Sequence, residues 1–121
     1  MTNHKILLVD DDQNLLEMLF SIFKRAGYTN LLTAASGAQA LRVWRDEQPN
    51  LIVLDVMMPH LNGLEVCEAV RQESNVPVIF VTALGQEGDT LAGFRAGADD
   101  YITKPFSFPV LVAKAQALMR R

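Results

Sequence analysis

The sequence predicts an α/β domain in which a parallel β-sheet lies between two layers of helices. Short, continuous apolar runs occupy residues 6–9, 51–54 and 76–81. Runs of this kind are typical of parallel strands that are covered on both faces. Stretches with the apolar spacing of amphipathic helices separate these runs, and this alternation favours a parallel sheet with right-handed crossover connections.

Five strand–helix units can be followed along the chain. Two weaker strands are expected at residues 30–35 and 101–103. Apolar residues at helical spacing mark five helices, around Leu15 to Phe23, Ala40 to Trp44, Leu64 to Val70, Leu91 to Phe94 and Leu111 to Met119. Ser36 with Gln39 and Asn62 with Glu65 have the spacing of a capping box. Ser107 is the expected N-cap of the last helix, with Pro109 in its first turn.

Length and composition limit the classes of function. The 121 residues suit a single domain spanning 1–121, and the net charge of −3 does not favour direct binding of nucleic acid. A single cysteine, Cys67, excludes an internal disulfide. No apolar run approaches the roughly 18 residues of a membrane helix, and the first residues do not form a signal peptide. We therefore expect a cytoplasmic domain without membrane contact.

Polar residues follow the predicted strands at the edge where an open parallel sheet binds its ligands. Asp10, Asp11 and Asp12 follow the first strand, and Asp55 directly follows the third. Thr82 and Ala83 follow the fourth strand, and Lys104 follows the fifth. Four segments distant in the sequence thus bring carboxylates, a hydroxyl and an ammonium group to one edge.

This combination of residues indicates phosphoryl chemistry. Neighbouring carboxylates repel one another unless a cation is present, and Mg²⁺ prefers one or two carboxylates together with water and phosphate oxygens. A carboxylate beside Mg²⁺ can attack phosphorus and form an aspartyl phosphate. Lys104 and the Thr82 hydroxyl could contact the phosphoryl group, while the small Ala83 leaves room for it. Each residue also has a simpler interpretation. Aspartates after a strand often cap the next helix, a lone Thr82 is more often a strand residue, and a lone Lys104 is more often solvated.

Four motifs resemble the receiver domain of two-component response regulators, across essentially all 121 residues. They are Lys-Ile-Leu-Leu-Val-Asp-Asp-Asp (5–12), Leu-Ile-Val-Leu-Asp-Val-Met-Met-Pro (51–59) with Asn62-Gly63, Val-Pro-Val-Ile-Phe-Val-Thr-Ala (76–83), and Gly-Ala-Asp-Asp-Tyr-Ile-Thr-Lys-Pro-Phe (97–106). The resemblance implies a flavodoxin-like (βα)5 fold with strand order 2-1-3-4-5, for which a member of this family is itself a standard example. The stretch 97–106 and the ending Leu118-Met119-Arg120-Arg121 resemble the subfamily whose receivers are joined to winged-helix DNA-binding domains.

The resemblance also implies roles for individual residues. Asp55 would accept the phosphoryl group, and Mg²⁺, or Mn²⁺ in its place, would be held by Asp10, Asp11, Asp55 and the backbone carbonyl of Met57. Thr82 and Lys104 would contact the phosphoryl group, and Tyr101 would swing inward on activation. A cis peptide bond between Lys104 and Pro105 is also implied. Asp12 is not a standard ligand in the family.

Receivers of this subfamily dimerise through their fourth helix, fifth strand and fifth helix. In this chain Asp100 and Lys114 are expected to form a charge pair of that surface, whereas Thr90, Arg95, Val110 and Gln116 depart from the usual charges. Read independently, Val110, Ala113 and Ala117 form a second apolar row on the last helix, off the expected core row. This row is either a consequence of the helix propensity of alanine or a contact face.

The function implied is a phosphorylation-dependent switch. A sensor histidine kinase would phosphorylate Asp55, and the changed surface would control an output, which is transcription if the domain belongs to a longer regulator. The chain would not be an enzyme beyond its own phosphorylation and dephosphorylation. Two alternatives are a receiver-like module that binds partners without phosphorylation and an aspartyl-phosphate phosphatase of the haloacid-dehalogenase type. The second lacks support because Asp10 to Asn14 does not contain the threonine of that family's motif.

Overall fold

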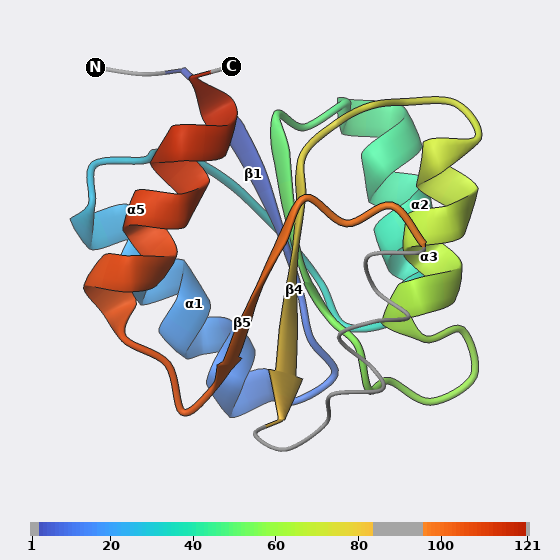
Figure 1. Cartoon of the computed structure of the whole chain (residues 1–121), viewed down its shortest axis with the longest axis horizontal. Coiled ribbons are helices and arrows are strands. Elements are labelled where there is room, and N and C mark those ends of the chain that lie inside the picture. The colour runs from blue at the N-terminus through green and yellow to red at the C-terminus, as the bar shows by residue number, and fades with distance from the viewer. Residues whose placement is uncertain (1–2, 84–95, 121) are drawn as a thin grey trace.

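A computed structural model describes residues 3–83 and 96–120 (Figure 1). The strands are β1 (Lys5–Val9), β2 (Asn30–Ala34), β3 (Leu51–Asp55), β4 (Val78–Ala83) and β5 (Asp100–Lys104). The described helices are α1 (Gln13–Arg25), α2 (Gly37–Glu47), α3 (Gly63–Arg71) and α5 (Phe108–Met119). All strand pairs are parallel, in the order β2-β1-β3-β4-β5. The predicted flavodoxin-like topology is therefore confirmed.

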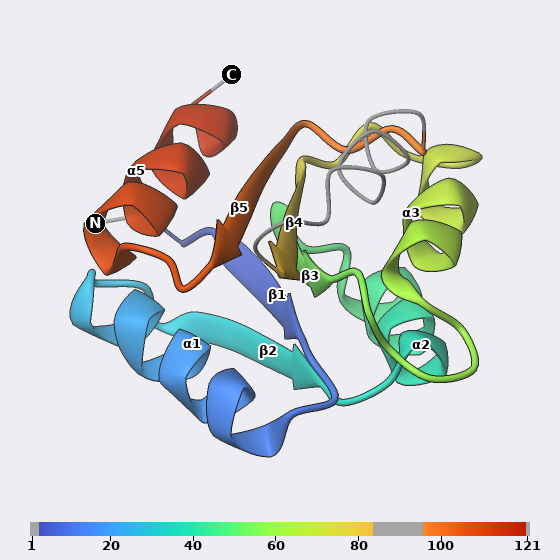
Figure 2. The same ribbon diagram turned by 60° about the horizontal axis from the view of Figure 1, so that its bottom comes forward.

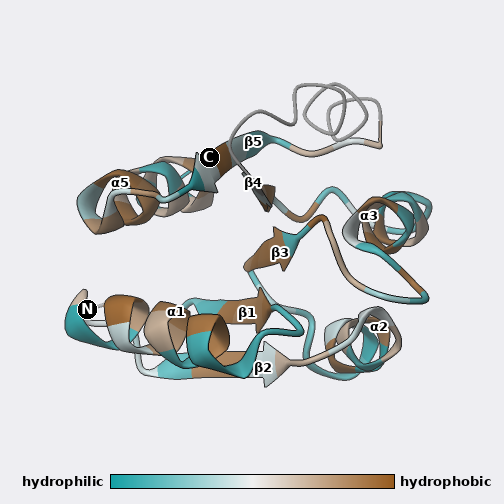
Figure 3. Ribbon diagram, turned by 90° about the horizontal axis from the view of Figure 1, so that it is seen from below, coloured by the Kyte–Doolittle hydropathy of each residue, from teal (hydrophilic) through white to brown (hydrophobic). Residues whose placement is uncertain are grey.

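The molecule has three layers. Helices α1 and α5 cover one face of the sheet, and α2 and α3 cover the other (Figures 1 and 2). Seen from below, the sheet lies between these two helix pairs, and the central strands β1 and β3 are strongly hydrophobic (Figure 3). This arrangement explains the continuous apolar runs, because both faces of a central strand are buried.

Each face of the sheet has its own core. Alternate residues of β1, Ile6 and Leu8, pack with α1 and α5, whereas Leu7 and Val9 pack with α2 and α3. The first core is formed by side chains that include Leu19, Phe23, Val53, Ile79, Leu111 and Ala115. The second core includes Ala40, Trp44, Ile52, Phe80, Val66 and Cys67. Trp44 and Cys67 are thus buried in this second core.

The helices begin at the polar residues that the sequence predicts. Asn62 and Glu65 form a complete capping box, and the Ser107 hydroxyl accepts a hydrogen bond from the Val110 amide. The box at Ser36 is only half formed: the Ser36 hydroxyl accepts from the Gln39 amide, but the Gln39 side chain accepts from Ala35. That bond to Ala35 also explains why β2 ends at Ala34, one residue earlier than expected.

The largest error in the predicted strands concerns β4. It was expected at residues 76–81 and occupies Val78–Ala83. The Val76 amide donates to the Ser74 hydroxyl, and Pro77 has no amide to donate, so these two apolar residues belong to the loop. β5 extends one residue beyond the expected 101–103 at each end. The helix expected around Leu91 to Phe94 lies outside the described residues.

None of the helices in the described part of the chain has both the length and the apolar character needed to cross a membrane.

Candidate functional site

The parallel strands bring the predicted site residues to one edge of the sheet. Asp10 directly follows β1, Asp55 ends β3, Thr82 is the penultimate residue of β4, and Lys104 ends β5. The arrowheads of β4 and β5 in Figure 1 mark this carboxyl edge. Asp10 and Lys104, which are 94 positions apart in the sequence, are therefore neighbours in space.

Three carboxylates gather at this edge. Asp10, Asp11 and Asp55 each place one oxygen within 4.8 Å of the others, with Asp10 and Asp55 buried and Asp11 exposed. Asp10 Oδ2 is fully buried and has no hydrogen bond within the described structure. Burying a carboxylate oxygen without a hydrogen-bond donor costs free energy, so this oxygen is well suited to bind a cation.

Lys104 is the cation that the structure places beside this cluster. Its Nζ lies 3.7 Å from Asp55 Oδ1 and 3.9 Å from Asp10 Oδ2. These are ion-pair separations that are too long for good hydrogen bonds. One ammonium group between two buried carboxylates leaves the cluster with an excess of negative charge.

The pKa values of the two buried carboxyl groups are both raised, mainly because the groups are buried. Burial raises the pKa of Asp10 to about 6, and the charge of Asp55 acts in the same direction. The Asp12 amide and Lys104 oppose this rise in the pKa of Asp10. Burial likewise raises the pKa of Asp55, against the opposing effects of Lys104 and the Met57 amide. A bound divalent cation would remove this penalty on ionisation.

Asp12 organises the first acidic segment without joining the cluster. Its carboxylate caps α1 by accepting hydrogen bonds from the amides of Asn14 and Leu15. Its own amide donates to Asp10 Oδ1 at 2.9 Å. The simpler interpretation of an aspartate as a helix cap thus holds for Asp12, whereas Asp10 and Asp11 belong to the carboxylate cluster.

The turn after β3 holds Asp55 in place. The Met57 amide donates to Asp55 Oδ1 at 3.2 Å, and the Gly63 amide donates to the Val56 carbonyl at 3.1 Å. A Cβ atom at Gly63 would collide with the backbone carbonyl oxygen of Asp55. Gly63 therefore lets the start of α3 approach the end of β3. The sequence signal for this role is weak, because Gly63 stands out only as the second residue of the Asn62-Gly63 motif.

The structure places the other predicted site residues as follows. Thr82 is buried and pairs with Thr103 in the strand register. Tyr101 is half-buried and packs against the core on the α2–α3 side. The Met57 side chain is 57% exposed, and the Lys104–Pro105 bond is cis, as expected. The side chain of Ala83 and the residues Thr90 and Arg95 lie outside the described part of the structure.

The residues proposed for an interface lie on β5 and α5. Lys114 Nζ bonds to Asp100 Oδ2 at 3.0 Å, which confirms the expected pair. Val110, Ala113 and Ala117 all face outward, and Val110 is 46% exposed. The second apolar row of the last helix is thus a surface feature, whereas Leu111, Ala115 and Leu118 form the core row.

The cysteine is not part of the site. Cys67 is buried in α3, where burial raises the pKa of its thiol to about 11 and its Sγ contacts the Ala96 carbonyl oxygen at 3.4 Å. A thiol in this setting remains protonated and is a poor nucleophile. The carboxylates are the nucleophiles that the edge of the sheet offers.

Comparison with known proteins gives one consistent family. The family described as the response regulator receiver domain matches residues 6–116. A probable transcriptional regulator ycf27 of Cyanophora paradoxa is 47% identical over 117 residues, which cover 97% of this chain and 48% of that protein. The alkaline phosphatase synthesis transcriptional regulatory protein PhoP of Bacillus subtilis is 44% identical, over 98% of this chain and 50% of that protein. The chain thus spans about half the length of these relatives.

Solved structures agree with this comparison. A putative response regulator from Chloroflexus aurantiacus superposes with a TM-score of 0.94 at 36% identity, over 99% of this chain and 100% of that one. The chemotaxis protein CheY4 of Vibrio cholerae gives a TM-score of 0.89 at 30% identity, over 97% of this chain and 99% of that one.

Proposed function

This chain belongs to the response regulator receiver domain family, and on that premise we propose that it is a signalling switch that accepts a phosphoryl group on Asp55. Receiver domains of response regulators are phosphorylated by sensor histidine kinases, and they are signalling proteins rather than classical enzymes. The observation that carries the proposal is the buried pair of carboxylates, Asp10 and Asp55, with Lys104 beside both at the carboxyl edge.

The site residues suit a divalent cation. Receiver domains typically bind Mg²⁺ through acidic residues. Here Asp10 Oδ2 is buried without a hydrogen bond in the described structure, and the pKa values of Asp10 and Asp55 are raised, and both features favour binding of a cation. Asp10, Asp11, Asp55 and the Met57 carbonyl would hold Mg²⁺, with Mn²⁺ as a substitute. When bound, the ion supplies positive charge that lets the carboxylates ionise together and that offsets the charge of a phosphoryl group.

The transfer itself is a displacement at phosphorus. An oxygen of the Asp55 carboxylate attacks the phosphorus atom of a phosphohistidine, the new O–P bond forms, and the N–P bond breaks to release the imidazole. Lys104 balances charge on the phosphoryl oxygens, and the Thr82 hydroxyl donates a hydrogen bond to one of them. Ala83, as a small residue, leaves space for the group.

The output passes through the surface that contains β5 and α5. Thr82 moves toward the phosphoryl group, and Tyr101 turns inward behind it, so that phosphorylation shifts the population between two packings. The changed surface, with Arg95, Asp100, Val110, Ala113, Lys114 and Ala117, supports a homodimer. Control of transcription follows if the domain belongs to a longer regulator, like the transcriptional regulators that it resembles, and this domain itself does not bind DNA.

The test is the intact mass of the protein after incubation with Mg²⁺ and acetyl phosphate. We expect a phosphoryl adduct in the wild type, none in Asp55→Asn, and none after chelation of the metal. Asp12→Ser is the matched control, because serine keeps the cap of α1 and removes a neighbouring carboxylate that lies outside the acidic cluster. A wild type without an adduct would favour a module that binds partners independently of phosphorylation.

A further inference from the structure

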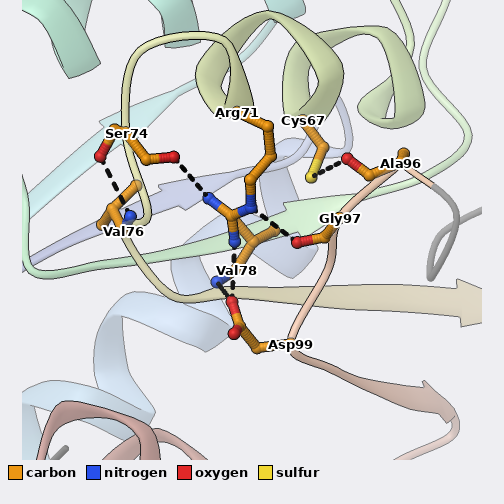
Figure 4. A network of polar contacts seen from close by, with 8 residues as sticks. All are labelled: Cys67, Arg71, Ser74, Val76, Val78, Ala96, Gly97 and Asp99. Carbon is orange, nitrogen blue, oxygen red and sulfur yellow. Dashed lines mark hydrogen bonds and ion pairs between the residues drawn. The ribbon is translucent and has the colours of Figure 1, made fainter.

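A second polar cluster lies at the amino ends of β4 and β5, opposite the acidic site along the same strands (Figure 4). Its centre is Arg71, the last residue of α3. Arg71 donates from Nε to the Gly97 carbonyl at 2.7 Å, from Nη2 to Asp99 Oδ2 at 2.8 Å, and from Nη1 to the Ser74 carbonyl at 3.3 Å. One guanidinium group thereby joins the end of α3 to the turn that precedes β5.

Asp99 connects this guanidinium group to β4. Its Oδ2 accepts a hydrogen bond from the Val78 amide at 2.9 Å as well as the bond from Arg71. Its own amide donates to the Val78 carbonyl at 2.9 Å. Asp99 therefore engages both backbone groups of the first residue of β4, directly before the pairing of Ile79 with Asp100 begins.

The turn before β5 is shaped to receive the Arg71 side chain. Gly97 has a φ of +103°, and a Cβ atom there would lie 2.7 Å from Arg71 Cγ. The absence of a side chain thus serves both the backbone conformation and the close passage of the arginine. Lysine could not replace Arg71, because it cannot present a planar fork of donors to three separate acceptors.

The register of β5 determines where Lys104 lies. β5 pairs only with β4 in the described sheet, and its last residue, Lys104, lies opposite Ala83. A slip of one residue would move the strand by about 3.3 Å and turn its side chains to the other face. The Lys104 ammonium already lies 3.7 and 3.9 Å from its carboxylate partners, so a slip or fraying of β5 would separate them.

We propose that Arg71 and Asp99 are positioning residues for Lys104: they fix the register of β5 on β4 and thereby hold the ammonium group beside Asp10 and Asp55. This inference rests on the proposed function, because it concerns the lysine of the same site. It adds residues that touch neither the acidic cluster nor the phosphoryl group.

The first test measures coupling between Asp99 and Lys104. The initial rate of phosphorylation by acetyl phosphate with Mg²⁺ is followed by intact mass in the wild type, Asp99→Asn, Lys104→Ala and the double variant. We expect Asp99→Asn to slow the reaction about tenfold when Lys104 is present and less than about twofold when it is absent. Arg71→Lys should resemble Asp99→Asn. Equal slowing in both backgrounds, or no slowing in either, would overturn the proposal.

The matched control is Glu47→Gln, which removes the ion pair between Lys5 and Glu47 at the amino end of β1. This pair ties a different strand, so its loss should leave the phosphorylation rate unchanged. All rates are compared at a temperature at which the unfolding curve of each variant shows it to be folded. A similar slowing in Glu47→Gln would mean that the rate reports general loosening and not the register of β5.

A second readout needs neither metal nor phosphorylation. In the metal-free protein, Asp55→Asn should shift the ¹³Cε resonance of Lys104, because the two groups are neighbours. In the Asp99→Asn background this shift should be largely lost, whereas an unchanged shift would overturn the positioning role. If the wild type forms no phosphoryl adduct, the proposed function fails, and this resonance still decides whether Asp99 places Lys104.

Discussion

At the scale of single residues, the acidic site holds two buried carboxyl groups whose ionisation is unfavourable. Asp10 and Asp55 are 1% and 4% exposed, and Lys104 is the ammonium group that bridges them. Their raised pKa values follow mainly from burial, which penalises the charged form of each carboxyl group. The same residues that weaken the metal-free fold are the ones that a cation and a phosphoryl group require.

Removing one of these charges should stabilise the metal-free protein. Asp10→Asn keeps the size of the side chain and abolishes the charge that burial and Asp55 oppose. We expect the free energy of unfolding at pH 7 to rise by about 1–3 kcal/mol, as measured by urea denaturation in the presence of a chelator. Asp12→Ser, outside the cluster, should change it by less than about 0.5 kcal/mol. A destabilised Asp10→Asn would contradict the charge argument.

The stability of the metal-free protein should also depend on pH through this residue. The pKa of Asp10 rises from 3.8 in the unfolded chain to about 6 in the fold, so the native state binds its proton more tightly. The contribution of Asp10 is therefore fully present below pH 4 and is lost as the pH rises through about 6. The difference between wild type and Asp10→Asn in urea midpoints should grow over this interval. A difference that is constant from pH 4 to pH 7 would refute the assignment.

At the scale of elements, the contact of α3 with β3 places the acceptor. Gly63 is the first residue of α3 and lies against the carbonyl of Asp55. Backbone atoms of Asp55 and Val56 occupy the space that a Cβ at Gly63 would need. Asn62 caps the N-terminus of the same helix through its capping box. The loop of residues 56–62, which contains Met57, is thus fixed at both ends by short-range contacts.

Gly63→Ala should disturb both stability and metal binding. The added methyl group meets backbone, which cannot rotate away, so we expect a loss of about 2 kcal/mol in unfolding free energy and weaker Mg²⁺ binding. The control is Ala69→Gly, six residues later in the same helix, which lowers helix propensity by about 1 kcal/mol. Mg²⁺ titration by calorimetry separates the two variants. Equal Mg²⁺ affinity in Gly63→Ala and the wild type would show that Gly63 does not place Asp55.

The outward row of α5 leads to a prediction about assembly. Val110 is 46% exposed, on the same outward row as Ala113 and Ala117. A glutamate at position 110 would place a charge in an apolar contact formed by this row. We expect the phosphorylated wild type to dimerise and Val110→Glu to remain monomeric by light scattering, with its phosphorylation unchanged. Met18→Glu, at a 40% exposed position of α1, is the control and should still dimerise. Dimerisation of Val110→Glu would exclude this face.

At the scale of the whole molecule, the architecture could be predicted from local patterns. The fully buried runs of β1 and β3, the amphipathic spacing of α1 and the caps at Asn62 and Ser107 carry their own signals. Placement of the site then follows from parallel strand order alone, since carboxyl ends share one edge. Contacts between distant residues had no such signal: Arg71 and Asp99 are 28 residues apart, and their pairing depends on the turn at Gly97. The start of β4 differs from the prediction for a local reason: the Val76 amide donates to the Ser74 hydroxyl, and Val76 therefore belongs to the loop.

The most direct test of the central claim is to locate the phosphoryl group chemically. Borohydride reduces an acyl phosphate to an alcohol, so it converts a phosphorylated aspartate to homoserine, which peptide mass mapping then places in the sequence. After incubation with acetyl phosphate, we predict homoserine at position 55, dependent on Mg²⁺ and slowed in Lys104→Ala. Homoserine at Asp10 or Asp11, or none at any position while the protein remains folded, would contradict the account.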